Sequence, residues 1–233
     1  DPVKKLIWPR LAAATLARAA TMRRAAERPR FIVHSLGRSG STLLSDLLDA
    51  HPQIECDGEI LSHPLLFVSP DRFVRSRAAL FPSVCYGFKL RPRHYADQNI
   101  ADASSFVRTL HEEGWVIIHL ERRNLLRIAL SWVTRSHTRV VHRTVRDRHR
   151  PQRQYIPIPE LLERLERAET DTLIEQRALA DVPAIRLTYE DDLLGHDTQQ
   201  ATMNRLFSEL GVGPAVVKSQ FVRLSGDRLE DSV

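Results

Sequence analysis

The sequence contains only two cysteines, Cys56 and Cys85, among its 233 residues. Two cysteines are too few for a disulfide framework, and neither stands in a spacing typical of metal ligands. We therefore expect a reducing, cytoplasmic environment and no bound metal. The sequence also lacks an apolar run as long as a membrane span, which argues against an ordinary transmembrane helix.

Acidic residues are outnumbered by basic ones, 29 against 34, which gives a formal net charge of +5. This mild excess suits an anionic ligand but does not by itself indicate nucleic-acid binding. Hydrophobic residues make up 42% and charged residues 27% of the chain, which is ordinary for a soluble globular protein. The length suits one domain, or one domain with a modest appendage.

Residues 1–30 are rich in alanine and arginine and contain only two acids, Asp1 and Glu27. Scattered apolar residues predict a basic helical segment, interrupted at Pro9, in front of an α/β domain over residues 31–233. Packing or contact with a second copy in a homo-oligomer is the favoured interpretation of this segment. Peripheral contact with an anionic membrane, or a targeting role, is the alternative.

The most informative stretch is residues 31–50, where the hydrophobic pattern changes. An apolar run from Phe31 to Val33 predicts a buried parallel strand, and leucines from Leu43 onward lie on one face of a predicted helix. Between them stands Gly37-Arg-Ser-Gly-Ser-Thr42, with two glycines, three hydroxyls and one cation. Backbone N–H groups converge on an anion in this strand–turn–helix arrangement, so we predict a phosphate-type site here.

The stretch lacks the lysine of nucleoside-triphosphate loops, whose pattern is G-x-x-x-x-G-K-[ST]. Ser41 follows Gly40 where that lysine belongs, and Ser35 takes the place of the first glycine. ATP chemistry with magnesium is therefore disfavoured, and Arg38 supplies the cation instead. A glycine turn that merely links a strand to a helix is the alternative without function.

A second junction of the same kind follows the apolar segment Trp115–Leu120, which predicts a central parallel strand. Asn124 is a candidate N-cap for the helix that follows. Arg123 and Ser131 place a cation and a hydroxyl at this junction. Two such junctions predict a ligand with two separated anionic groups.

Strands and helices alternate along the rest of the chain, which predicts a three-layer α/β fold, a P-loop-like parallel sheet flanked by helices. Lys89 lies in one of the apolar strands and should either face a bound anion or extend to the surface. Further strands are predicted at residues 84–90 and 182–189, and helices at 72–81, 101–113, 157–173 and 197–210, with a short helix from 214.

Residues 135–153 carry seven arginines and three histidines against one acid, Asp147. Such a run is usually a solvated face or a mobile loop, and a lid over an anionic ligand is the alternative. The run contains no aromatic residue on which bases could stack, which argues against a nucleic-acid partner.

Three segments together resemble sulfotransferases that use 3′-phosphoadenosine 5′-phosphosulfate (PAPS). Gly37–Thr42 resembles the 5′-phosphosulfate loop, with Arg38 as in the bacterial and carbohydrate-directed branch. Arg123 followed eight positions later by Ser131 resembles the 3′-phosphate motif. Leu187-Thr-Tyr-Glu-Asp191 resembles the strand end whose tyrosine, here Tyr189, lies near the adenine.

The resemblance implies transfer of a sulfuryl group from PAPS to a hydroxyl of a carbohydrate, a glycolipid or another small molecule. The product of the donor would be adenosine 3′,5′-bisphosphate (PAP). The residues that the resemblance implies for donor binding are Gly37, Arg38, Ser39, Gly40, Ser41, Thr42, Leu43, Arg123, Ser131 and Tyr189.

Two family motifs differ here. Lys89-Leu90-Arg91 aligns with the Lys-Thr-His motif of cytosolic members and lacks the histidine that serves as base there. Similarity to the bacterial branch implies Glu59 as the base, with Arg38 and Lys89 as catalytic cations; the weaker candidates for the base are His51, His63 and His94. The C-terminal Arg-Lys-Gly loop of the family is not recognisable in residues 223–228.

Two other classes of function stay open at this point. A P-loop kinase would require ATP and magnesium. A non-catalytic protein that binds nucleotides or membranes would use the basic residues of 1–30 and 135–153.

Overall fold

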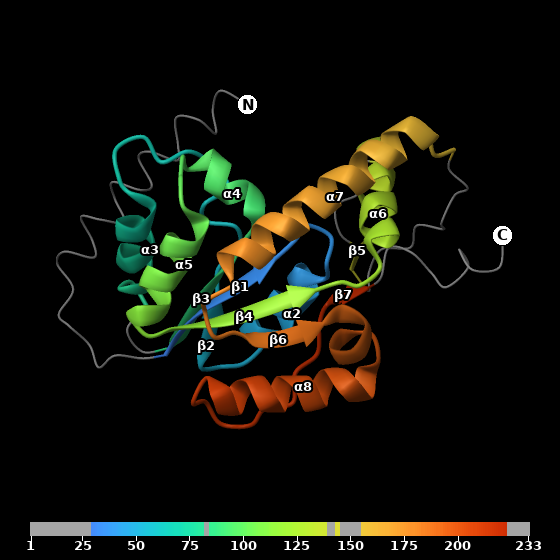
Figure 1. Ribbon diagram of the computed structural model, residues 1–233. Helices are drawn as coiled ribbons and strands as arrows, with labels where there is room; N and C mark the ends of the chain where they lie inside the picture. Colours follow the sequence, from blue (N-terminus) through green and yellow to red (C-terminus); the bar gives the residue numbers. More distant parts are fainter. Residues whose placement is uncertain (1–28, 82–83, 139–142, 145–154, 223–233) are drawn as a thin grey trace.

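The computed structural model describes residues 29–81, 84–138, 143–144 and 155–222. Its centre is a five-stranded parallel sheet with the order β2-β3-β1-β4-β6 (Figure 1). The strands are β1 (Arg30–Ser35), β2 (Ile54–Cys56), β3 (Cys85–Leu90), β4 (Trp115–Glu121) and β6 (Ile185–Thr188). The predicted parallel α/β sheet is therefore confirmed.

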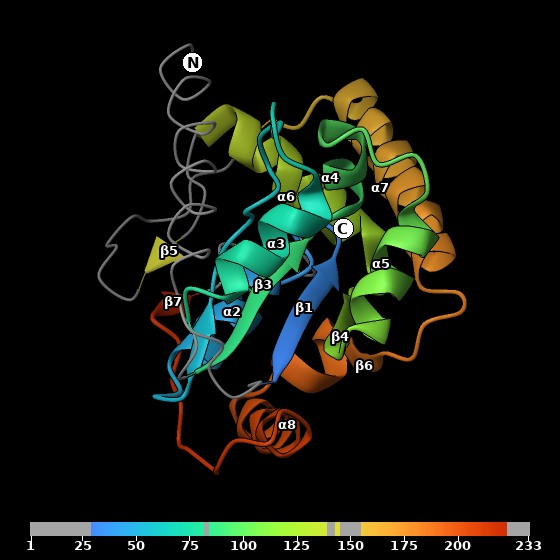
Figure 2. The same ribbon diagram turned by 90° about the vertical axis from the view of Figure 1, so that its left-hand side faces the viewer.

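Helices cover both faces of this sheet, as the prediction of three layers requires (Figure 2). One face carries α3 (Pro70–Ala78), α4 (Pro92–Asp97), α5 (Ala103–Glu112) and α7 (Ile158–Ala178), whereas the other carries α2 (Ser41–Asp49) and α8 (His196–Glu209). Helix α6 (Leu125–Thr138) packs beside α7. Among the described residues, no helix combines the length and the apolar character that crossing a bilayer requires.

The central strand β1 shows why its sequence is continuously apolar. Ile32 packs into the core between the sheet and α3, α5 and α7. Its neighbours Phe31 and Val33 point to the opposite face and pack against α2 and α8. Because successive side chains of a strand face opposite sides, a sheet covered on both sides requires apolar residues at every position.

Several predicted boundaries differ from the structure. Strand β6 stops at Thr188, because Tyr189–Leu193 form a turn of π-helix. The short helix predicted from residue 214 is wrong: residues 212–219 have no regular structure. The Gln200 side chain explains this difference, since it donates to the Ala215 carbonyl (2.9 Å) and accepts from the Val217 N–H (3.2 Å), and so satisfies backbone groups without a helix.

Two short strands, β5 (Arg143–Thr144) and β7 (Phe221–Val222), form a separate antiparallel pair. Residues 1–28 of the predicted basic segment, most of the charged run at 135–153, and residues 223–228 lie outside the described residues. Those predictions stay predictions.

A buried polar group fastens α7 to the sheet. Glu175 is 2% exposed and accepts from His34 of β1, with 3.0 Å between its Oε1 and Nδ1. Its Oε2 lies 3.2 Å from His119 Nε2 of the adjacent strand β4, and the Tyr95 hydroxyl lies 2.6 Å from His34 Nε2. Burial by itself raises the pKa of Glu175, but its contacts with His119 and His34 outweigh burial and lower that pKa.

Replacing Glu175 by alanine is expected to lower the free energy of unfolding by about 3–5 kcal/mol at neutral pH, because it leaves buried histidine donors without their acceptor. Since the folded-state pKa of Glu175 is below its ordinary value of 4.5, its contribution is complete above that value and is lost as the pH falls further. Urea unfolding at neutral and acidic pH measures both effects. Glu169→Ala, at an exposed position of α7, is the matched control and should change stability little.

Candidate functional site

The candidate site lies where the parallel strands end. Strands β1, β3, β4 and β6 run in the same direction, so the segments that follow them meet at one edge of the sheet. Those segments carry Arg38, Arg91, Arg122 and Tyr189, and the loop after β2 adds Glu59. Open α/β sheets bind ligands at this edge.

The anion loop, residues 37–42, has the backbone geometry of a tight turn into α2. Gly40 is the N-cap of α2 and has φ of 100°, a left-handed value that favours glycine. A methyl group at Gly40 would also overlap the ring of Tyr189, so glycine is needed for this contact. Ser39 is buried and its hydroxyl donates to the Leu36 carbonyl (2.8 Å), which fixes the turn.

The start of α2 supplies backbone donors. Leu44 N–H is bonded to the Gly40 carbonyl (3.1 Å), as in the first i→i−4 bond of a helix. The N–H groups of Ser41, Thr42 and Leu43 precede this bond and so have no place in the helical pattern. Together with the positive end of the helix dipole, they are suited to a phosphate-type group, as predicted for this loop.

Arg38 joins the two predicted anion-binding junctions. Its Nε donates to the Ser131 hydroxyl on α6 (2.8 Å), and its carbonyl accepts from Arg122 Nη1 (3.1 Å). Burial, followed by the charges of Arg135, Arg122 and Arg91, lowers the pKa of Arg38 to about 10. Arg38 is still a cation at neutral pH, and a bound anion would relieve the repulsion among these four arginines.

Tyr189 lies against the same loop. It is buried, and the guanidinium carbon of Arg122 stands 4.6 Å from the centroid of its ring. A cation over a tyrosine ring at this distance is a favourable contact. The predicted adenine-side tyrosine is therefore next to the anion loop, packed on Gly40 and under Arg122.

Arg123 lies at the same junction, but its side chain points to the surface. It is 59% exposed and pairs with Asp191 (2.6 Å). Glu190 accepts from the N–H groups of Arg123 (3.1 Å) and Asn124 (3.3 Å). The Asn124 side chain accepts from the N–H of Arg127 (3.0 Å), which confirms the predicted N-cap.

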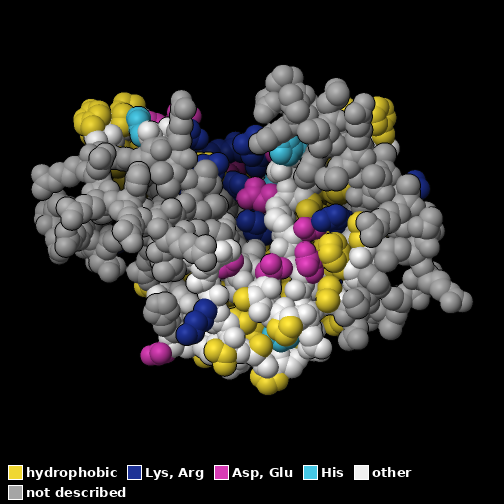
Figure 3. Space-filling view, turned by 180° about the vertical axis from the view of Figure 1, so that it is seen from behind, with side chains coloured by type: hydrophobic (Ala, Val, Ile, Leu, Met, Phe, Trp, Pro, Cys, Tyr) yellow, Lys and Arg dark blue, Asp and Glu magenta, His cyan; other side chains and the backbone are white. Residues whose placement is uncertain are grey.

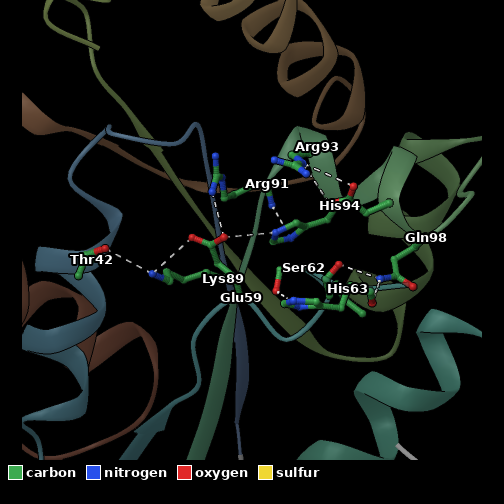
Figure 4. Close-up of polar contacts among 11 residues, drawn as sticks. Thr42, Glu59, Ser62, His63, Lys89, Arg91, Arg93, His94 and Gln98 are labelled. Carbon is green, nitrogen blue, oxygen red and sulfur yellow. Dashed lines mark hydrogen bonds and ion pairs between the residues drawn. The ribbon is translucent and has the colours of Figure 1, made fainter. Parts of the chain in front are cut away.

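Glu59 lies at the centre of a group of cations (Figure 4). Its Oε2 accepts from Arg91 Nη1 (2.9 Å) and lies 3.6 Å from His94 Nε2. Its Oε1 is 3.9 Å from Lys89 Nζ, which in turn donates to the Thr42 hydroxyl in the anion loop (3.4 Å). The predicted base and the predicted second cation are thus both connected to the loop.

The neighbouring side chains keep Glu59 ionised. Burial by itself raises its pKa, but the contact with His94 and the charges of Arg91 and Lys89 outweigh burial and lower the pKa to about 2. Burial lowers the pKa of Lys89, whose side chain is only 11% exposed, and the charge of Glu59 opposes that effect. Glu59 is therefore a carboxylate at neutral pH.

The histidines named as weaker bases have other contacts. His94 Nδ1 accepts from the N–H of Arg91 (3.2 Å), so in the neutral ring Nε2 carries the proton and faces Glu59 as a donor. His51 uses both ring nitrogens on backbone, Nε2 on the Gly213 carbonyl (2.8 Å) and Nδ1 on the Gln53 N–H (3.0 Å). His63 Nδ1 lies 3.0 Å from the Ser62 hydroxyl.

Three side chains at this site were not predicted as functional: Arg91, Arg122 and Trp132. The guanidinium carbons of Arg91 and Arg135 lie 5.6 Å and 5.3 Å from the Trp132 ring. Arg91 had a signal in the sequence, because it stands two residues after Lys89, and residues two apart along a strand face the same side. Nothing in the sequence indicated a functional role for Arg122 or Trp132.

Seen from behind, the molecule is hollowed, and Lys and Arg side chains gather in the hollow with carboxylates beside them (Figure 3). The predicted site residues are therefore brought together at one edge of the sheet, with the Arg123 side chain directed outward. The whole arrangement suits an anionic ligand next to an acceptor of protons.

Part of this chain is similar in sequence to one known family. Residues 29–112 match the sequence model of the sulfotransferase family. A sulfotransferase from Alicyclobacillus acidocaldarius has a similar structure, with a TM-score of 0.50 and 12% identity over 88% of this chain and 90% of that one. The mouse sulfotransferase SULT7A1 complexed with PAP gives a TM-score of 0.47 and 14% identity over 85% of this chain and 63% of its own. No curated protein matches the sequence.

Proposed function

We propose that this chain, whose residues 29–112 match the sulfotransferase family, moves a sulfuryl group from PAPS to a hydroxyl of a small-molecule acceptor. The observation that carries the proposal is the contact chain from the anion loop to Glu59. Thr42, Lys89 and Glu59 follow one another at 3.4 Å and 3.9 Å. An anion site and a carboxylate that can accept a proton are thereby held side by side.

The described residues fit a donor with several negative charges. Burial, together with the charges of the surrounding Arg135, Arg122 and Arg91, lowers the pKa of Arg38 to about 10. Such a group of cations is more stable with an anion bound than without one. The backbone N–H groups of the anion loop would hold the 5′-phosphate, and Tyr189 would lie beside the adenine.

The other end of the donor would be held at the second junction. Ser131 already contacts Arg38 and would offer its hydroxyl to the 3′-phosphate. Arg123 would have to exchange Asp191 for that phosphate, because the two side chains are paired at 2.6 Å. Both groups are at the surface, where such a pair contributes little, so the exchange has a small cost.

The bound donor supplies a sulfuryl group on a good leaving group, and the chain supplies the proton acceptor and the cations. Glu59 would take the proton of the acceptor hydroxyl, whose oxygen forms a bond to sulfur. The bond between sulfur and the 5′-phosphate oxygen breaks, and its electron pair stays on the phosphate. Arg38 and Lys89 would stabilise that charge, an effect that is usually large in such sites.

The test is transfer of labelled sulfate from PAPS to a panel of sugars, lipids and phenols, with calorimetric titration of PAP and of ATP with magnesium. We expect transfer to one acceptor class and binding of PAP. Binding of ATP with magnesium in place of PAP would favour the kinase alternative. Binding to liposomes or RNA with no transfer to any acceptor would favour a non-catalytic role.

The acceptor class and the branch of the family belong to the same proposal. Arg38 in the anion loop supports the bacterial and carbohydrate-directed branch, in which sugars or glycolipids are acceptors. The panel decides this directly, because a phenol acceptor would contradict that assignment while leaving sulfuryl transfer in place.

A further inference from the structure

Resting on the proposed function, we propose that Arg91 is a further catalytic residue, which exchanges Glu59 for the oxygens of the sulfuryl group when the donor binds. Neither the resemblance to known motifs nor the comparisons assign a role to Arg91. The exchange would hold the group in transfer and at the same time release the carboxylate for the acceptor hydroxyl.

Arg91 is positioned against the anion loop itself. A methyl group at Gly37 would overlap its Nη2 and lie 2.8 Å from Trp132 Cζ2, so the guanidinium lies directly over that glycine. On its other side, Nη1 donates to Glu59 Oε2 (2.9 Å). The guanidinium therefore bridges the loop that would hold the donor and the carboxylate that would hold the acceptor (Figure 4).

The Arg91 side chain is largely buried and lies near the Trp132 ring. Its side chain is 16% exposed, and the guanidinium carbon lies 5.6 Å from the Trp132 ring. Its Nε is buried and has no hydrogen-bond partner among the described residues. A buried donor without a partner is uncommon, so the contacts that Arg91 makes among the described residues leave its guanidinium incompletely satisfied.

Charge balance favours the exchange. Glu59 is the single carboxylate among the contacts that Arg91 and Lys89 make in the described residues. The incoming donor brings several negative charges to the same two cations, and arginine can hold two oxygens of one anion at once. As the cations turn to the donor, the proton affinity of Glu59 rises, which is what a base needs at the moment of transfer.

The step itself is the one proposed above, with Arg91 added. The acceptor oxygen bonds to sulfur, the bond from sulfur to the 5′-phosphate oxygen breaks, and the proton passes to Glu59. The three other oxygens on sulfur carry negative charge throughout, and Arg91 would donate to them. His94 would keep its donor facing Glu59, so the carboxylate keeps one neutral partner after the exchange.

The experiment compares Arg91→Gln and Arg91→Lys with Arg93→Gln as the matched control. Arg93 lies two residues away, its side chain is 67% exposed, and it pairs with Asp97 of the same helix. Each variant is titrated by calorimetry with PAPS in the absence of acceptor and with PAP, and kcat is then measured. PAP lacks the sulfuryl group, so the comparison isolates contacts to that group.

For Arg91→Gln we expect kcat to fall by about 10²–10³-fold, with affinity for PAPS reduced and affinity for PAP nearly unchanged. The acid limb of kcat/KM for the donor should also move from about 2 towards the ordinary Glu value of 4.5, because Glu59 loses its nearest cation. Arg91→Lys should recover part of kcat, since lysine keeps the positive charge but lacks the planar guanidinium that can hold two oxygens at once.

If Arg91→Gln loses as much affinity for PAP as for PAPS, or has a kcat like that of the Arg93→Gln control, the proposed role of Arg91 is overturned. If Arg91→Gln does not fold, the test uses Arg91→Lys instead, and its affinity for PAPS is compared with its affinity for PAP in the same way. A wild-type chain that binds PAP but transfers no sulfate would refute the proposed function instead, so the two failures are distinguishable.

Discussion

Replacing Arg38 by alanine is expected to lower the kcat of sulfuryl transfer by at least about 10²–10³-fold and to weaken PAP binding as well. Arg38 is the cation of the anion loop, and its Nε contacts Ser131 at the second junction. In the proposed mechanism, the change removes the positive charge beside the leaving oxygen and the contact between the two ends of the proposed donor site. Steady-state kinetics with PAPS and calorimetry with PAP measure the two effects.

A change in backbone strain would not account for this expected loss of activity. Arg38 has φ of 71°, a left-handed value, and alanine would carry the same conformational cost there. Arg38→Lys keeps the charge but loses the planar fork, so it should fall between alanine and wild type. Arg108→Ala, at an exposed position of α5, is the control for the loss of one arginine. An Arg38→Ala chain with normal kcat would remove Arg38 from the catalytic site.

The fold could be predicted largely because the sheet is buried on both faces. The runs at Phe31–Val33 and Trp115–Leu120 have no polar alternation, and both became central strands, β1 and β4. What could not be predicted depends on distant side chains. Gln200 keeps residues 215–217 out of a helix, and this contact spans 15 residues of sequence.

The candidate site was predictable where one short stretch carries both the backbone geometry and the chemistry. The glycines and hydroxyls of residues 37–42 did so, and the anion loop has the expected turn into α2. Arg122 and Trp132 could not be identified, because their roles come from packing against Tyr189 and Arg91. The lowered pKa of Glu59 could not be predicted either, because the three partners that lower it come from later segments of the chain.

Replacing Glu59 by glutamine is expected to lower kcat by about 10²–10⁴-fold while PAP binds as well as before or more tightly. Glutamine keeps an oxygen that can accept from Arg91, but it cannot take a proton. It also removes the negative charge that now occupies Lys89 and Arg91, which leaves both cations to the donor. Single-turnover kinetics and calorimetry with PAP separate the loss of transfer from the gain in binding.

The matched control is Glu112→Gln, an exposed carboxylate at the end of α5, which should leave kcat unchanged. A Glu59→Gln chain with normal turnover would exclude Glu59 as the base and turn attention to His63, since His94 faces Glu59 as a donor and both His51 nitrogens bind backbone.

The pH dependence distinguishes the two kinds of base in the wild-type chain. With a pKa of about 2, Glu59 is ionised throughout the neutral range, and its activity should be lost only as the pH falls towards that value. A histidine base would instead give an acid limb in kcat/KM for the donor near its ordinary pKa of about 6.5. Because kcat reports the complex in which the cations face the donor, its limb should lie above that of kcat/KM if Glu59 is the base. Coincident limbs near the histidine value would contradict the assignment.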